Sequence, residues 1–177
     1  MIDVICYWSM VNHVNVENNE REVPYYAIHK DGVIAGFFGY FSFLSNFYPL
    51  QNGVTFEEVC YPSVEAAYQA AKYPWNERSQ FVEVTATHAK RLGKLAPGFN
   101  AKKWSKKKYD LMYALNWQKY INDPNLQEKL VMTEGCHLEE RNSWNDTWWG
   151  TDENGNGENN LGKILMKIRD VMSDEQS

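Results

Sequence analysis

The stretch 61-YPSVEAAYQAAKYP-74 decides the fold, because the chain changes there from a strand pattern to a helical one. Ser63 is a good N-cap, and Tyr73-Pro74 ends a helix that is predicted over residues 64–72. Before this stretch, β-branched and aromatic runs predict strands over residues 1–8, 25–29 and 33–41. After it, apolar spacing predicts helices over residues 77–83, 87–93, 106–120, 124–133 and 161–171. We therefore expect a single α+β domain that is mostly helical after an N-terminal strand-rich portion.

The helix over residues 64–72 carries an unusual polar strip. At 100° per residue, its apolar side chains form one stripe, and Glu65, Gln69 and Lys72 fall together on another face. The flank beyond this strip holds Ala66 and Ala70, where an exposed helix normally has long polar residues. We interpret the strip as the lining of a groove; an ordinary exposed polar face is the alternative. Burial in a groove raises the pKa of a glutamate and lowers that of a lysine.

Charge is unevenly distributed along the chain. The 177 residues carry 18 basic and 23 acidic side chains, a net charge of −5, yet residues 84–109 contain eight basic residues and no acidic one. The rest of the chain therefore has 10 basic against 23 acidic residues, or −13. Three of the lysines, at 106–108, fall in the first turn of a helix expected to begin near Ser105, where the helix dipole disfavours cations. This window predicts a basic face for phosphate, with a solvated lysine surface as the alternative.

Composition excludes several classes of protein. No apolar run approaches the ~20 residues of a membrane helix, and the N-terminus lacks the basic and apolar regions of a signal peptide. The three cysteines are widely spaced, which excludes a disulfide framework or a cysteine-rich zinc site. The four histidines show no metal-binding spacing. We expect a cytoplasmic protein with no membrane association, no metal, no cofactor and no obligate protein partner.

Five separated motifs resemble one known family. In chain order they are 43-FLSNFYP-49, 61-YPSVEAAYQAAK-72, 89-AKRLGK-94, 146-DTWWG-150 and 157-GENNLGKILMKIR-169. Together they resemble the NADAR (NAD and ADP-ribose) family, also called YbiA-like N-glycosidases, over about residues 36–172. The resemblance divides the chain into an N-terminal extension (1–35), a domain of YbiA-like fold (36–172) and a tail (173–177). Ala66 stands where the family commonly has His, so the role of that histidine is not carried over.

The resemblance implies hydrolysis of an N-glycosidic bond between a ribose and a nucleobase-like group. One implied substrate is ADP-ribose attached to guanine, including guanine in nucleic acid. The other is the ribosylamino-pyrimidine phosphates of riboflavin synthesis. Bond breaking builds positive charge on C1′, so Glu65 is the candidate for stabilising that charge or activating water. Asp146 is the second carboxylate candidate. Three roles are open to Lys72: donating a proton, binding the ribose, or attacking C1′ to form a Schiff base.

Further residues in the motifs are candidates for substrate binding. Trp104 and Trp149 would stack on the base, although tryptophans more often pack in the core. Arg91 and Lys94 would hold phosphate. The remaining candidates are Asn46, Tyr68, Gln69, Gly150 and Asn159, of which Asn159 has an alternative as a helix cap. Two other functions stay open: a non-catalytic module that binds ADP-ribose or NAD, and an NAD glycohydrolase.

Overall fold

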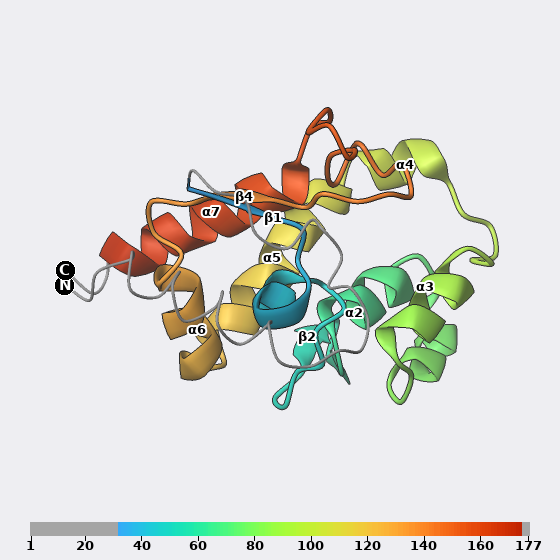
Figure 1. Cartoon of the computed structure of the whole chain (residues 1–177). Helices are drawn as coiled ribbons and strands as arrows, with labels where there is room; N and C mark the ends of the chain where they lie inside the picture. Colours follow the sequence, from blue (N-terminus) through green and yellow to red (C-terminus); the bar gives the residue numbers. More distant parts are fainter. Residues whose placement is uncertain (1–31, 175–177) are drawn as a thin grey trace, which may run out of the picture.

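The computed structural model describes residues 32–174, so the strands expected over residues 1–8 and 25–29 lie outside this range. Figure 1 shows the described part as a set of helices with two short strand pairs that lie apart from each other. β1 (Val33–Ala35) pairs in parallel with β4 (His137–Glu139), and β2 (Val54–Phe56) pairs antiparallel with β3 (Val59–Tyr61). The β2–β3 hairpin turns through Glu57 and Glu58, both with positive φ, as tight hairpin turns require.

The strand expected over residues 33–41 is wrong beyond Ala35. The chain turns at Gly36, whose φ is 76°, and continues as a 3-10 helix, η1 (Gly39–Leu44). Glycine adopts positive φ without steric cost, so Gly36 and Gly39 allow a turn that the aromatic residues around them conceal. The aromatic side chains of η1 still enter the core, since Phe41 and Phe43 are buried.

The helical part follows the expected order with three corrections. Its elements are α2 (Val64–Ala70), η2 (Trp75–Phe81), α3 (Ala86–Gly93), α4 (Ala101–Ser105), α5 (Lys108–Ile121), α6 (Pro124–Val131) and α7 (Asn160–Asp174). The helix expected over residues 77–83 is a 3-10 helix, and α4 was not expected. The helix expected from residue 106 begins at Lys108, so Lys106 and Lys107 precede it. Only Lys108 therefore lies in the first turn of α5, and the expected cluster of three lysines there is wrong.

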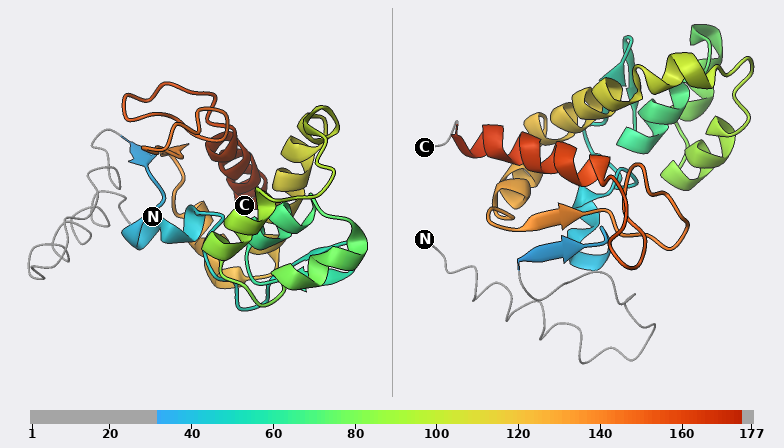
Figure 2. Two further views of the ribbon diagram at one scale, coloured as in Figure 1. Left: turned by 90° about the vertical axis from the view of Figure 1, so that its right-hand side faces the viewer. Right: turned by 90° about the horizontal axis from the view of Figure 1, so that it is seen from above.

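The core lies between α2, α5 and α7. Figure 2 shows α7 between α5 and the β1–β4 pair, and its buried residues include Leu161, Ile164 and Leu165. Ser63 caps α2 by accepting a hydrogen bond from the backbone N of Ala66 at 3.1 Å. The apolar stripe of α2 packs into this core, and Ala66 and Ala70 on the other flank of the polar strip are buried in it as well. None of the helices within residues 32–174 has the length and apolar character to cross a membrane.

Candidate active site

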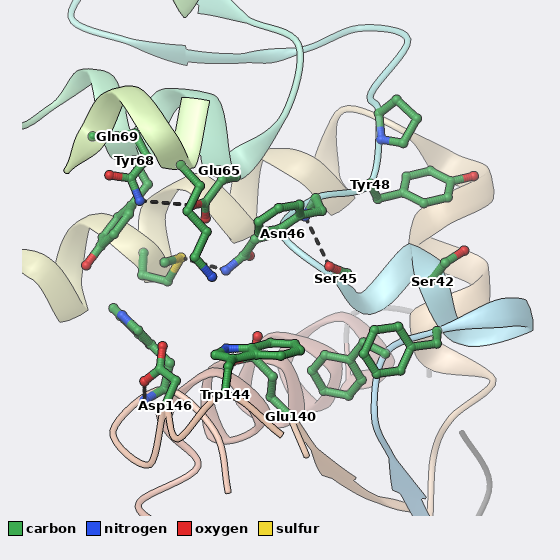
Figure 3. A pocket seen from close by; sticks show the side chains of 18 of the residues that line it. Ser42, Ser45, Asn46, Tyr48, Glu65, Tyr68, Gln69, Glu140, Trp144 and Asp146 are labelled. Carbon is green, nitrogen blue, oxygen red and sulfur yellow. Dashed lines mark hydrogen bonds between the residues drawn. The ribbon is translucent and has the colours of Figure 1, made fainter. Parts of the chain in front are cut away.

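The polar strip of α2 lines a cavity of about 1000 Å³. One wall is α2 with α3 beside it, another is the segment of residues 37–49, and the facing wall is the segment of residues 140–149 (Figure 3). The groove expected along α2 is therefore present. The polar side chains at the cavity are Ser42, Ser45, Asn46, Tyr48, Glu65, Tyr68, Gln69, Lys72, Lys90, Lys94, Glu140, Arg141 and Asp146.

Gln69 connects the two charged residues of the strip. Its Nε2 donates to Glu65 Oε1 at 2.8 Å, and its Oε1 accepts from Lys72 Nζ at 2.6 Å. Burial raises the pKa of Glu65, against the opposing effects of the Gln69 hydrogen bond and the charges of Lys90 and Lys72. Burial lowers the pKa of Lys72, and the Glu65 charge opposes that shift. Both shifts have the direction expected for groups that exchange protons near neutral pH.

The amide bridge fits because α3 ends in a glycine. Gly93 is buried, and a Cβ added to it would lie 1.7 Å from Gln69 Oε1. Any side chain at this position therefore competes with the Gln69 amide for the same space. The glycine in the motif 89-AKRLGK-94 therefore leaves room for the amide that links Glu65 to Lys72.

Aromatic rings surround the amine of Lys72. Its Nζ lies 5.4 Å from the ring centroid of Tyr68, 5.5 Å from that of Trp104 and 5.8 Å from that of Phe99. Tyr68 in turn makes edge contacts with Trp104 and Trp149, with centroids 5.0 and 5.7 Å apart. The rings stabilise the ammonium form by cation–π attraction and at the same time exclude water from it.

Asp146 lies on the wall that faces α2 (Figure 3). Its Oδ1 accepts a hydrogen bond from the backbone N of Trp149 at 3.0 Å, and its own N donates to Asn142 Oδ1 at 3.0 Å. These bonds fix the loop that carries Asp146 and Trp149. Glu65, Lys72 and Asp146, the three catalytic candidates, therefore line one cavity.

Asn46 joins the same cavity next to Glu65. Its backbone O accepts from the backbone N of Glu65 at 3.0 Å, and its side chain contacts α5 through Asn116 Nδ2 (3.1 Å) and Met112 Sδ (3.3 Å). The buried Lys119, also on α5, donates to the backbone O of Ser45 at 2.8 Å. One face of α5 thus holds the segment that carries Asn46.

The structure brings only part of the expected binding set to the cavity. Asn46, Tyr68, Gln69, Lys94 and Trp149 line it, and Trp104 packs behind them against Tyr68 and Lys72. Arg91, Gly150 and Asn159 do not line it.

The three exceptions have physical reasons. Arg91 is exposed, because a residue that follows Lys90 on a helix points about 100° away from it. Gly150 approaches the backbone of Glu140, where an added Cβ would lie 1.9 Å from the carbonyl O. Asn159 bonds to the backbone N of Glu140 (3.0 Å) and the backbone O of Leu138 (2.9 Å). Gly150 and Asn159 therefore support the backbone at Glu140 without lining the cavity themselves.

Several cavity residues are absent from the predicted site, among them Lys90, Glu140 and Trp144. Lys90 Nζ lies 5.3 Å from the ring centroid of Phe47 and 5.4 Å from that of Trp144, between two exposed aromatic rings. Helical phase could have identified Lys90, because it precedes Lys94 by four residues and therefore lies on the same face of the helix. Glu140 and Trp144 follow a short strand, where the sequence alone does not say which side chains face inward.

The cavity combines groups for acid, base and cation-stabilising chemistry. Within residues 32–174, no three side chains of His, Cys, Asp or Glu are arranged to hold a metal ion. Burial, together with the charges of Asp146 and Glu65, raises the pKa of Glu140 to about 8. Three carboxyl groups and three lysine amines line this cavity, and such groups can hold and move protons at the bond of a bound substrate.

Comparisons with known proteins identify the family of the chain. A model of the NADAR domain matches residues 37–173. A riboflavin biosynthesis protein of Vibrio vulnificus is 31% identical over 134 residues, which are 75% of this chain and 36% of the Vibrio protein. An N-glycosidase of Nostoc punctiforme is 29% identical over 131 residues, which are 71% of this chain and 82% of that protein. The chain thus spans about a third of the length of the Vibrio protein.

A solved structure gives the same result for the fold. The NMR structure of the E. coli protein YbiA matches with a TM-score of 0.68 and 25% sequence identity, covering 86% of this chain and 92% of YbiA. This match confirms the expected α+β, mostly helical domain of YbiA-like fold. Because the family model matches most of its length, the chain belongs to the NADAR family.

Proposed function

We propose that the chain hydrolyses the N-glycosidic bond between a phosphorylated ribosyl group and a nucleobase-like leaving group. The observation that carries this proposal is the buried Glu65, joined through Gln69 to Lys72 and facing Asp146 across the cavity. The names of relatives support it, since proteins of Nostoc punctiforme and of Shigella boydii are N-glycosidases.

The chemistry follows from where charge develops. As the C1′–N bond breaks, its electron pair goes to the base and C1′ becomes electron-poor. The Glu65 carboxylate stabilises that positive charge, and Asp146 accepts a proton from the water that attacks C1′. In the covalent alternative, Lys72 Nζ bonds to C1′ as the base departs. One Nζ proton passes to the departing base and the other to O4′ as the C1′–O4′ bond opens, which gives an imine that water hydrolyses to the free sugar and the lysine amine.

The rest of the cavity suits a base and an anion. Lys90 and Lys94 line it and provide positive charge for phosphate, while Trp149 and Trp144 offer aromatic faces to a base. A cavity of about 1000 Å³ is large for a single ribosylamino-pyrimidine phosphate. Its size favours an ADP-ribosyl substrate, with ADP-ribosylated guanine as the leading candidate.

Substrate cleavage tests the proposal directly. The chain is incubated separately with an ADP-ribosylated guanine oligonucleotide, with ribosylamino-pyrimidine phosphates and with NAD, and released base or sugar is measured. We expect release from one of the first two, lost in Glu65→Gln and kept in the exposed control Glu134→Gln. Tight binding without turnover would instead indicate a non-catalytic ADP-ribose module, and nicotinamide release from NAD alone an NAD glycohydrolase.

Borohydride trapping decides the role of Lys72. If the imine forms, reduction during turnover gives a covalent adduct in the wild-type chain and none in Lys72→Ala. An adduct of equal yield in Lys72→Ala would assign the imine to another amine. The absence of any adduct during confirmed turnover would leave Lys72 as a proton donor or ribose ligand.

A further inference from the structure

Glu140 enters the cavity from a rigid backbone. Its N donates to Asn159 Oδ1 at 3.0 Å, and its O accepts from the backbone N of Thr151 at 3.0 Å. Gly150 packs so closely that an added Cβ would lie 1.9 Å from the same carbonyl O. The carboxyl group of Glu140 is therefore aimed into the cavity from a fixed point, on the wall that faces Glu65 (Figure 3).

The adjacent Glu139 shows the contrast. It is buried away from the cavity, and its Oε1 accepts from Arg141 Nε at 2.8 Å and from Thr151 Oγ1 at 2.6 Å. Within residues 32–174, no hydrogen bond reaches the carboxyl group of Glu140. Alternation along the end of β4 thus gives one carboxylate a structural ion pair and leaves the other free to meet a ligand.

We propose that Glu140 is the general acid that protonates the leaving base. This inference rests on the proposed N-glycosidase function. As the C1′–N bond breaks, the bond electrons go to the base nitrogen, which takes the proton of the Glu140 carboxyl group. Water adds its oxygen to C1′ and gives its proton to Asp146. Transfer of that proton back to Glu140 through solvent restores the starting state.

The charges around Glu140 suit this role. Glu65 on α2 and Asp146 on the loop face it with like charge, and Lys90 on α3 faces it with opposite charge. Arg141 is engaged by Glu139. Burial is the largest cause of the raised pKa of Glu140, and the two carboxylates add to it. A carboxyl group with a pKa of about 8 holds its proton at neutral pH, as a general acid must.

Kinetics with the ADP-ribosylated guanine oligonucleotide test the assignment. We expect Glu140→Gln to lower kcat by about 100-fold or more while KM stays within about threefold, because the amide cannot supply the proton. The kcat of the wild-type chain should fall as pH rises through about 8, and the residual activity of Glu140→Gln should lack this fall. Glu140→Asp, which keeps an acid, should restore part of kcat. The exposed Glu134→Gln is the matched control.

A measurement without substrate completes the test. In ¹³C NMR of protein labelled at glutamate carboxyl groups, one signal should titrate near pH 8 in the wild-type chain and be missing in Glu140→Gln. An unchanged kcat in folded Glu140→Gln, a rise in KM alone, or a residual activity with the wild-type alkaline fall would each overturn the role of Glu140 and leave the proposed function standing. Failure of the wild-type chain to cleave any ribosyl substrate would overturn both.

Discussion

Replacing Gly93 with alanine should lower the catalytic rate without altering any charged residue of the cavity. The added Cβ would lie 1.7 Å from Gln69 Oε1 and 2.5 Å from Gln69 Cδ, where ordinary contacts begin at 3.4 Å. The amide must therefore move by about 1.7 Å, the difference between the 1.7 Å separation and an ordinary 3.4 Å contact. A movement of that size breaks both the 2.8 Å bond to Glu65 and the 2.6 Å bond from Lys72.

The magnitude follows from these two bonds. Each involves a charged partner, and hydrogen bonds to charged groups contribute about 1.5–3 kcal/mol. Other groups in the cavity replace part of that interaction, so we expect a loss of about 2–3 kcal/mol in transition-state stabilisation, or about 30- to 150-fold in kcat/KM. Stability should change less, because alanine in a helix is favoured over glycine by about 0.5–1 kcal/mol.

A double-mutant cycle isolates the cause. Gln69→Ala removes the amide and should lower kcat/KM to a similar extent, because the bridge between Glu65 and Lys72 is lost. In Gly93→Ala/Gln69→Ala the added methyl group no longer meets an obstacle. The double variant should therefore match Gln69→Ala alone. Multiplied losses in the double variant, or a fully active Gly93→Ala, would refute the bridge as the reason for Gly93.

Two further predictions concern lysines. Burial lowers the pKa of Lys119 to about 7, so the unfolded chain binds more protons than the folded one between about pH 7 and 10.5. The contribution of this site to the free energy of unfolding should therefore rise by about 1.4 kcal/mol per pH unit in that range. Urea titrations at pH 7 and pH 9 should show this rise in the wild-type chain and not in Lys119→Met. An equal rise in both proteins would contradict the assignment to Lys119. Lys90→Met should raise KM for a phosphate-bearing substrate by about 5- to 30-fold and weaken its salt dependence, since Lys90 lies at the cavity between Phe47 and Trp144. The control Lys163→Met, at an exposed position, should leave KM unchanged. An unchanged KM in Lys90→Met would show that Lys90 does not bind the substrate.

Local patterns in the sequence predicted the parts of the fold that local interactions determine. Helix α2 was predicted well because Ser63 caps its start and Pro74 follows its end. The β2–β3 hairpin has no turn signal, because Glu57 and Glu58 occupy positive φ where glycine or asparagine is usual. The strand expected over residues 33–41 failed at Gly36, whose conformation depends on the chain around it.

The candidate site also has a part that the sequence predicts and a part that only the tertiary structure determines. Glu65, Gln69 and Lys72 share one helix, so helical phase alone places them together. The sequence predicts Arg91 as a phosphate ligand, whereas its neighbour Lys90 lines the cavity, and only the packing of α3 against α2 determines which of the two does so. The sequence showed no signal for Glu140, because its environment comes from Asp146, Glu65 and Lys90, which tertiary structure brings to it.

Base release by the wild-type chain and by Glu65→Gln tests the central claim most directly. The substrate is an ADP-ribosylated guanine oligonucleotide, with the ribosylamino-pyrimidine phosphates measured in parallel, and thermal melting verifies that the variant is folded. We expect the wild-type chain to release the free base from one of these substrates and Glu65→Gln to do so at least about 100-fold more slowly. Equal rates in the two proteins, or no release by the wild-type chain from either substrate, would contradict the claim that Glu65 acts in an N-glycosidase.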